Sequence, residues 1–180
     1  MSSTQLQQLV ERLLYEGESE TLDFKRQQYP FVKATNEEKA EILKDILAFA
    51  NAWRRSDAYI LVGVREVKGG KSTVVGVSEH LEDASLQEFV NSKTQRPVRF
   101  SYQACTCEDK SVGVFCIPVQ DRPVFLKCDF GGLKKNVVYI RRGTSTAEAN
   151  PDEITKMGEF DSGVSKSSPE LEWFFLNKET

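Results

Sequence analysis

The stretch "ILKDILAFANAWRRSDAYILVGV", residues 42–64, contains a helix followed closely by a strand. Apolar residues in its first part recur at helical spacing, which predicts a helix over 36–53 with a wide buried face. Thr35 and Glu38 stand at the two ends of a capping box, so they mark where this helix begins. Residues 58–64 are apolar throughout, as expected of a central strand covered on both faces. The stretch therefore predicts a sheet with helices packed against it.

The same periodicity predicts more elements on either side of this pair. We expect helices at 4–15, at 83–93, and from Asn150-Pro151 onward, where a cap residue, proline and two acids form a strong helix start. We expect strands at 21–26, 72–77, 97–105, 111–118, 123–128 and 137–141. Gly69-Gly70 is a hairpin turn signal between the central strand and its partner. The fold class is therefore α/β (α+β).

The length of 180 residues suits one domain with a tail. We expect a domain over 1–160, a flexible linker over 161–168, and an aromatic segment over 169–180 that docks on its own domain or on a partner. The start of the chain lacks the pattern of a signal peptide, and no apolar run approaches membrane-spanning length. A cytoplasmic location is expected, or a nuclear one in a eukaryote.

The net charge of −3 hides an uneven distribution. Bases are concentrated in residues 122–142, whereas residues 1–23 and 145–180 are acidic. A local basic surface of this kind permits a polyanionic partner such as nucleic acid.

Several motifs that could carry chemistry are weak. "GGKS", residues 69–72, resembles the end of a P-loop, but Arg65 stands where the first glycine is required, so a hairpin turn is the better interpretation. The four cysteines lack the spacing of a zinc knuckle and are better explained as buried free thiols. His80 is the one histidine, which removes most routes to an activated serine or cysteine nucleophile.

Carboxylates are the remaining candidates for catalysis. In "GESETLDFK", residues 17–25, alternation along a strand puts Leu22 and Phe24 on one face and Asp23 on the other. Glu18, Asp23 and Glu66 could together hold a divalent cation through oxygen ligands and activate water. The alternative is that these are ordinary solvated acids at strand ends.

Five segments in order resemble the Schlafen AlbA_2 domain family: "GESETLDFK", "ILKDILAFANAW", "YILVGV", "VVGV" and "VYIRRGTSTAEANPDEI". The resemblance covers about residues 15–155. It implies a mixed, largely antiparallel sheet flanked by helices, similar to one half of the Schlafen core. It also implies binding of DNA or of RNA such as tRNA, because several Schlafen proteins are metal-dependent endoribonucleases and other family members are described as nucleic-acid-binding modules.

Carried over by position, the family's three carboxylates correspond to Glu18, Asp23 and Glu66, which would be both the catalytic residues and the ligands of Mg²⁺ or Mn²⁺. Asp23 stands where the family has glutamate, and Arg65-Glu66 displaces the third acid by one residue. Glu66 can serve only where the strand ends or bulges. The expected phosphate contacts are bases that flank the family motifs: Lys25, Arg26, Arg54, Arg55, Lys134, Lys135, Arg141 and Arg142.

The alternative function is a non-catalytic module without a cofactor, serving as a regulatory or assembly subunit. Its aromatic segment, within 169–177, would then bind a protein partner or a second copy of the chain.

Overall fold

The computed structural model describes residues 1–161, which form four helices and eight strands. The helices are α1 (Ser3–Leu13), α2 (Asn36–Asn51), α3 (Asp83–Lys93) and α4 (Pro151–Asp161). The strands are β1 (Leu22–Lys25), β2 (Ala58–Val62), β3 (Val64–Arg65), β4 (Thr73–Val74), β5 (Ser101–Cys107), β6 (Lys110–Ile117), β7 (Tyr139–Arg142) and β8 (Ser145–Glu148).

The main sheet has the strand order β1-β2-β6-β5. β1 runs parallel to β2, whereas β2–β6 and β5–β6 are antiparallel, so the predicted mixed, largely antiparallel sheet is confirmed. Two separate hairpins, β3–β4 and β7–β8, complete the strands. The β3–β4 hairpin contains the Gly69-Gly70 turn, so the "GGKS" stretch lies in a hairpin as predicted.

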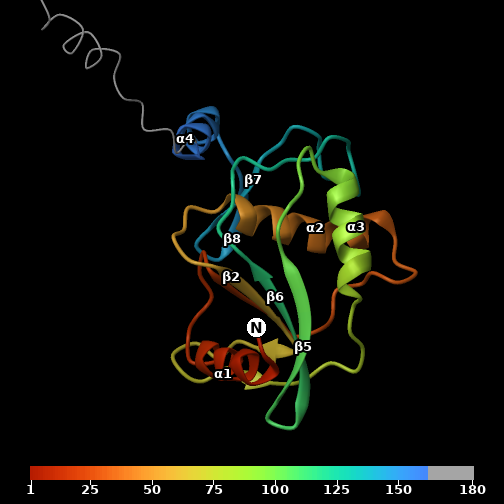
Figure 1. Ribbon diagram of the computed structural model, residues 1–180, viewed down its shortest axis with the longest axis vertical. Helices are drawn as coiled ribbons and strands as arrows, with labels where there is room; N and C mark the ends of the chain where they lie inside the picture. Colours follow the sequence, from red (N-terminus) through yellow and green to blue (C-terminus); the bar gives the residue numbers. More distant parts are fainter. Residues whose placement is uncertain (162–180) are drawn as a thin grey trace, which may run out of the picture.

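Helices cover both faces of this sheet (Figure 1). α1 packs on one face, where Leu22 and Phe24 of β1 lie in a cluster with its leucines. α2 and α3 pack on the other face. The β7–β8 hairpin lies against α2, with α4 near it at the end of the molecule opposite α1 (Figure 1). The predicted alternation along β1 is confirmed.

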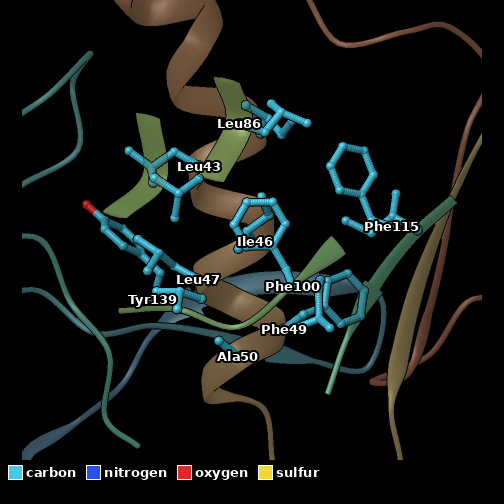
Figure 2. Packing of buried hydrophobic residues seen from close by; sticks show 14 of the residues in the cluster. Leu43, Ile46, Leu47, Phe49, Ala50, Leu86, Phe100, Phe115 and Tyr139 are labelled. Carbon is cyan, nitrogen blue, oxygen red and sulfur yellow. The ribbon is translucent and has the colours of Figure 1, made fainter. Parts of the chain in front are cut away.

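The apolar face of α2 is the centre of the larger core. Figure 2 shows its side chains between Phe115 of the sheet and Tyr139 of the hairpin. Leu43, Ile46 and Phe49 are each 0% exposed. Burying a side chain of this size contributes roughly 1.5–3 kcal/mol to stability. Because α2 packs against both the main sheet and the β7–β8 hairpin, this burial holds the sheet and the hairpin together.

Side-chain caps fix where two predicted helices begin. Thr35 and Glu38 exchange hydrogen bonds with each other's backbone N–H groups at the start of α2. Asn150 and Glu153 make the same reciprocal pair at the start of α4. Each cap satisfies backbone donors that a helix leaves unpaired.

Side chains also satisfy backbone groups at the outer edge of the sheet that β5 forms. At β5, the Asp83 carboxylate accepts the backbone N–H of Tyr102 at 2.7 Å. The Gln87 amide donates to the carbonyl of Phe100, just before the strand. α3 therefore supplies polar partners to the start of this edge strand.

Several of the predicted strands differ from those in the structure, among them that at 72–77, of which only Thr73–Val74 forms β4. Residues 123–128 form only an isolated bridge, at Leu126, because the Asn51 side chain binds the Val124 N–H and the Gln95 side chain binds the Phe125 N–H. The strand predicted from 97 begins at Ser101, since side chains again take the N–H groups just before it. β8 was not predicted.

The predicted linker, apart from its first residue, and the aromatic segment at 169–180 lie outside the described residues. Across the part that is described, no helix is long and apolar enough to cross a membrane.

Candidate functional site

The segment after α1 folds over the free edge of β1. Ser19 N–H donates to the Leu22 carbonyl at 2.9 Å. The Glu18 Oε1 atom accepts the Phe24 N–H at 3.2 Å. Because β1 is the outermost strand, these bonds satisfy backbone groups that would otherwise face solvent. Glu18 therefore has a structural role, because its carboxylate satisfies a backbone N–H of β1.

Glu66 reaches this segment because β2 ends before it. Gly63 has a φ of +91°, and a Cβ there would lie 3.0 Å from the backbone of Gly76, so the turn requires glycine. The chain then continues as β3, and Glu66 Oε1 accepts the Glu18 N–H at 3.2 Å. From the sequence, Glu66 could join the other two acids only if the central strand ended or bulged before it. β2 does end before it.

The pKa of Glu18 is raised above its ordinary value. Burial is the main cause, and the neighbouring carboxylates of Asp23 and Glu66 add to it. The hydrogen bond from Phe24 and the charge of Arg141 act in the opposite direction without cancelling the rise. Asp23 and Glu66 are thus both close enough to Glu18 to act on its carboxyl group electrostatically.

Asp23 differs from the other two acids because cations already neutralise it. Arg141 Nη2 lies 2.9 Å from its Oδ1, and Lys25 Nζ lies 3.0 Å from its Oδ2. The side chains of Asp23 and Arg141 are only 6% and 4% exposed. Arg141 also donates to the carbonyls of Ser19 and Gly143, and its guanidinium lies 4.7 Å from the centre of the Phe49 ring.

Lys25 extends this network toward the surface. Its ammonium lies 3.0 Å from Asp45 Oδ2, and the same oxygen accepts the Tyr29 hydroxyl at 2.6 Å. Burial alone would lower the pKa of Lys25, but the two carboxylates outweigh it and raise that pKa. Burial and Asp45 together raise the pKa of Tyr29 well above its ordinary value. Lys25 is therefore charged and Tyr29 protonated at neutral pH.

A divalent cation held by all three acids is not favoured by this arrangement. Both oxygens of Asp23 face cationic side chains, and one oxygen each of Glu18 and Glu66 is bound to a backbone N–H. Within residues 1–161, no group of three or more His, Cys, Asp or Glu side chains could hold a metal ion. A metal would have to compete with Arg141 and Lys25 for Asp23.

The bases expected to contact phosphate fall into two groups. Lys25 and Arg141 are held by carboxylates, and Arg54 donates to three backbone carbonyls. Internal partners therefore already occupy these three charged groups. The other five are exposed: Arg26, Arg55, Lys134, Lys135 and Arg142.

Lys44, a half-buried base not predicted to contact phosphate, lies near some of these exposed bases. Its ammonium is 6.0 Å from the centre of the Tyr139 ring, and the hydroxyl of Tyr139 accepts the Lys134 N–H at 3.0 Å. Lys44 and Arg26 also line one hollow of about 480 Å³. Arg26, Lys44, Lys134 and Lys135 are called the basic ridge below.

His80 lies against a serine, which the sequence did not predict. Its Nε2 is 2.5 Å from Ser111 Oγ, and its Nδ1 is 2.7 Å from Tyr102 Oη. Tyr102 Oη also accepts an N–H group from the Gln28 side chain. Burial lowers the pKa of His80, so the imidazole is neutral at pH 7. These contacts join the loop that carries His80 to β5 and β6.

The prediction of buried free thiols is confirmed for two of the four cysteines. All four are free, and Cys105 and Cys107 are buried beneath α1, whereas Cys116 is half-buried and Cys128 is exposed. Burial raises the pKa of Cys105 to about 11 and also raises that of Cys107, which keeps both protonated.

The hollow beside Lys25 was not predicted from the sequence. α2 contributes Glu41, Lys44 and Asp45 to it. These three residues follow i, i+3, i+4 spacing on the polar side of a confidently predicted helix, which was the available signal.

Comparisons with known proteins agree with this architecture. The sequence matches the family model "Schlafen, AlbA_2" over residues 18–150. A search of curated proteins finds no match. The crystal structure of the DIP2311 protein from Corynebacterium diphtheriae is similar with a TM-score of 0.55 and 16% identity, covering 88% of this chain and 28% of that one.

A second similar structure is the N-terminal domain of a RecG-related protein from Nitrosomonas europaea, with a TM-score of 0.44 and 18% identity over 71% of this chain and 81% of that one. The match to DIP2311 shows a shared fold, and this chain covers only 28% of that protein's length. The family model spans the carboxylate segment, α2, the central strand and the β7–β8 hairpin. The chain therefore belongs to the Schlafen AlbA_2 family.

Proposed function

We propose that this chain binds nucleic acid, RNA or DNA, through phosphate contacts from its exposed bases. The observation that carries the proposal is the basic ridge. Its charged groups come from a loop, a helix and a second loop that are far apart in sequence. Membership of the AlbA_2 family supports the same function, because the family resemblance implies nucleic-acid binding.

The charges of the ridge are only partly compensated. Arg26 makes no ion pair or hydrogen bond through its side chain with any described residue, and the Lys44 ammonium makes none within residues 1–161 apart from its contact with the Tyr139 ring. Lys134 lies 3.7 Å from Asp129 in an exposed pair, which water and salt weaken. Phosphate groups can therefore reach these bases at little cost in broken internal contacts.

Fluorescence anisotropy with a labelled single-stranded RNA and a tRNA-like hairpin tests the proposal. Affinity should fall linearly on a log–log plot against salt, with a slope of roughly −0.7 for each phosphate neutralised on a single strand. Lys135→Glu should weaken binding to all sequences alike and make the slope shallower by about one contact.

Lys68→Glu is the matched control, because Lys68 is an exposed lysine on the β3–β4 hairpin and undergoes the same change of charge. It should leave affinity nearly unchanged. Absence of binding at low salt, or equal effects of the two substitutions, would refute phosphate recognition by the ridge.

Metal-dependent RNA cleavage is the narrower candidate function. The approach of Glu66 to Glu18 and the raised pKa of Glu18 favour it, because carboxylates gathered in this way gain from a cation. The ion pairs of Asp23 oppose it. Cleavage of tRNA with Mg²⁺ or Mn²⁺ that is lost in Glu18→Ala would support this candidate, and binding without cleavage would leave the non-catalytic module.

A further inference from the structure

The hollow at the end of β1 has the size of a small-ligand site. Its volume is about 480 Å³, within the usual range of roughly 300–1,000 Å³ for such sites. One wall is the segment from Lys25 to Pro30, and the other is the polar side of α2. It opens beside the basic ridge, because Arg26 and Lys44 belong to both.

The inner wall is held together by hydrogen bonds and ion pairs and is nearly neutral. Asp45 holds the Tyr29 hydroxyl and the Lys25 ammonium at once, and Lys25 also lies against Asp23. With Arg141 on the far side of Asp23, two cations balance two carboxylates. The Gln28 side chain is likewise occupied, by Tyr102 and by two backbone groups. These groups shape the hollow but leave little charge for a ligand.

The rim carries the polar groups that still lack partners. The side chains of Arg26, Gln27 and Glu41 make no hydrogen bond or ion pair with any residue from 1 to 161, and Lys44 has only its ring contact. The rim thus offers two cations, one carboxylate and one amide. A ligand that matches it must carry an anion together with hydrogen-bond donors.

A nucleotide has this combination, and we propose that the hollow takes one nucleotide turned out of a bound single strand. This inference rests on the proposed function and specifies where a base is read. The phosphate lies at Arg26 and Lys44, where charge-assisted hydrogen bonds are strong. The edge of the base faces Glu41 and Gln27, as unstacked bases are commonly read in RNA recognition.

Glu41 gives the hollow a base preference. A carboxylate accepts the amino group of cytosine but repels the carbonyl oxygen that uracil has at the same ring position. We therefore expect cytidine to be preferred over uridine. Because the two bases have the same ring size, shape alone cannot produce this difference.

Isothermal titration calorimetry on the full chain tests the inference with cytidine 5′-monophosphate and uridine 5′-monophosphate. The cytidine nucleotide should bind about tenfold more tightly. Glu41→Gln should bring the ratio close to one, whereas Glu88→Gln, an exposed acid on α3, should leave it unchanged. Arg26→Gln should weaken both nucleotides by about tenfold. Arg96→Gln, which removes an exposed arginine outside the hollow, should not.

The outcomes separate this inference from the proposed function. Oligonucleotides that bind the ridge while neither mononucleotide binds would overturn the hollow as a nucleotide site and leave nucleic-acid binding intact. Mononucleotides that bind with the predicted preference while oligonucleotides fail would support the hollow and overturn the proposed function. Inorganic phosphate that binds as tightly as the nucleotides, with no base preference, would reduce the hollow to an anion site and overturn the inference.

Discussion

Arg141→Met tests whether Arg141 is an internal ion-pair partner or a phosphate contact. The substitution leaves Asp23 buried without its arginine, a change that typically costs about 3–5 kcal/mol. Lys25, 3.0 Å from the other carboxylate oxygen, compensates part of the charge and favours the lower end of that range. The lost hydrogen bonds to the carbonyls of Ser19 and Gly143 act in the opposite direction.

Urea unfolding of the full chain measures this cost, with Arg142→Met as the matched control. Arg142 is exposed and pairs with Glu153 at the surface, so its removal should cost less than about 1 kcal/mol. Adding Asp23→Leu to Arg141→Met should recover part of the loss, with a coupling energy of about 0.5–3 kcal/mol. Equal stabilities of the two single variants would refute the internal role of Arg141.

Two further predictions concern Glu18 and Gly113. The folded state raises the pKa of Glu18, so ionised Glu18 destabilises the protein above that pKa, and the effect disappears as pH falls toward the ordinary value. Glu18→Gln should therefore be more stable than the parent at pH 7 and equal to it near pH 4, and a pH-independent difference in urea midpoints would contradict this. In Gly113→Ala, the new Cβ would lie 2.3 Å from the Tyr102 hydroxyl oxygen, so about 1–3 kcal/mol should be lost, and an unchanged melting temperature would argue against this packing.

The elements that the sequence predicted well are those in which each residue's local preference agrees with its packing. α2 combines a capping box with a wide apolar face, and β2 is apolar throughout, so pattern and burial coincide. The predicted helix at 83–93 matches α3 for the same reason. β1 is short, but its alternation was enough to place Asp23 away from the α1 face.

The errors arise where side chains replace backbone partners. Residues 123–128 have the composition of a strand, yet the buried side chain of Asn51 takes both the N–H and the carbonyl of Val124. Such a contact joins residues more than seventy positions apart, so no local pattern can reveal it. The same limit applies to the site. From the sequence alone, Lys25 and Arg141 were interpreted as surface bases. In the folded protein, carboxylates lie beside both of them.

Closing the two edges of the main sheet restricts how other chains can associate with it. On β1, Glu18 and Ser19 occupy the outward groups of Phe24 and Leu22, and on β5, Asp83 occupies that of Tyr102. An incoming peptide that added a strand at these points would first have to displace those bonds. This arrangement disfavours strand exchange and edge-to-edge aggregation there, and it directs recognition toward the loops and the polar side of α2 instead.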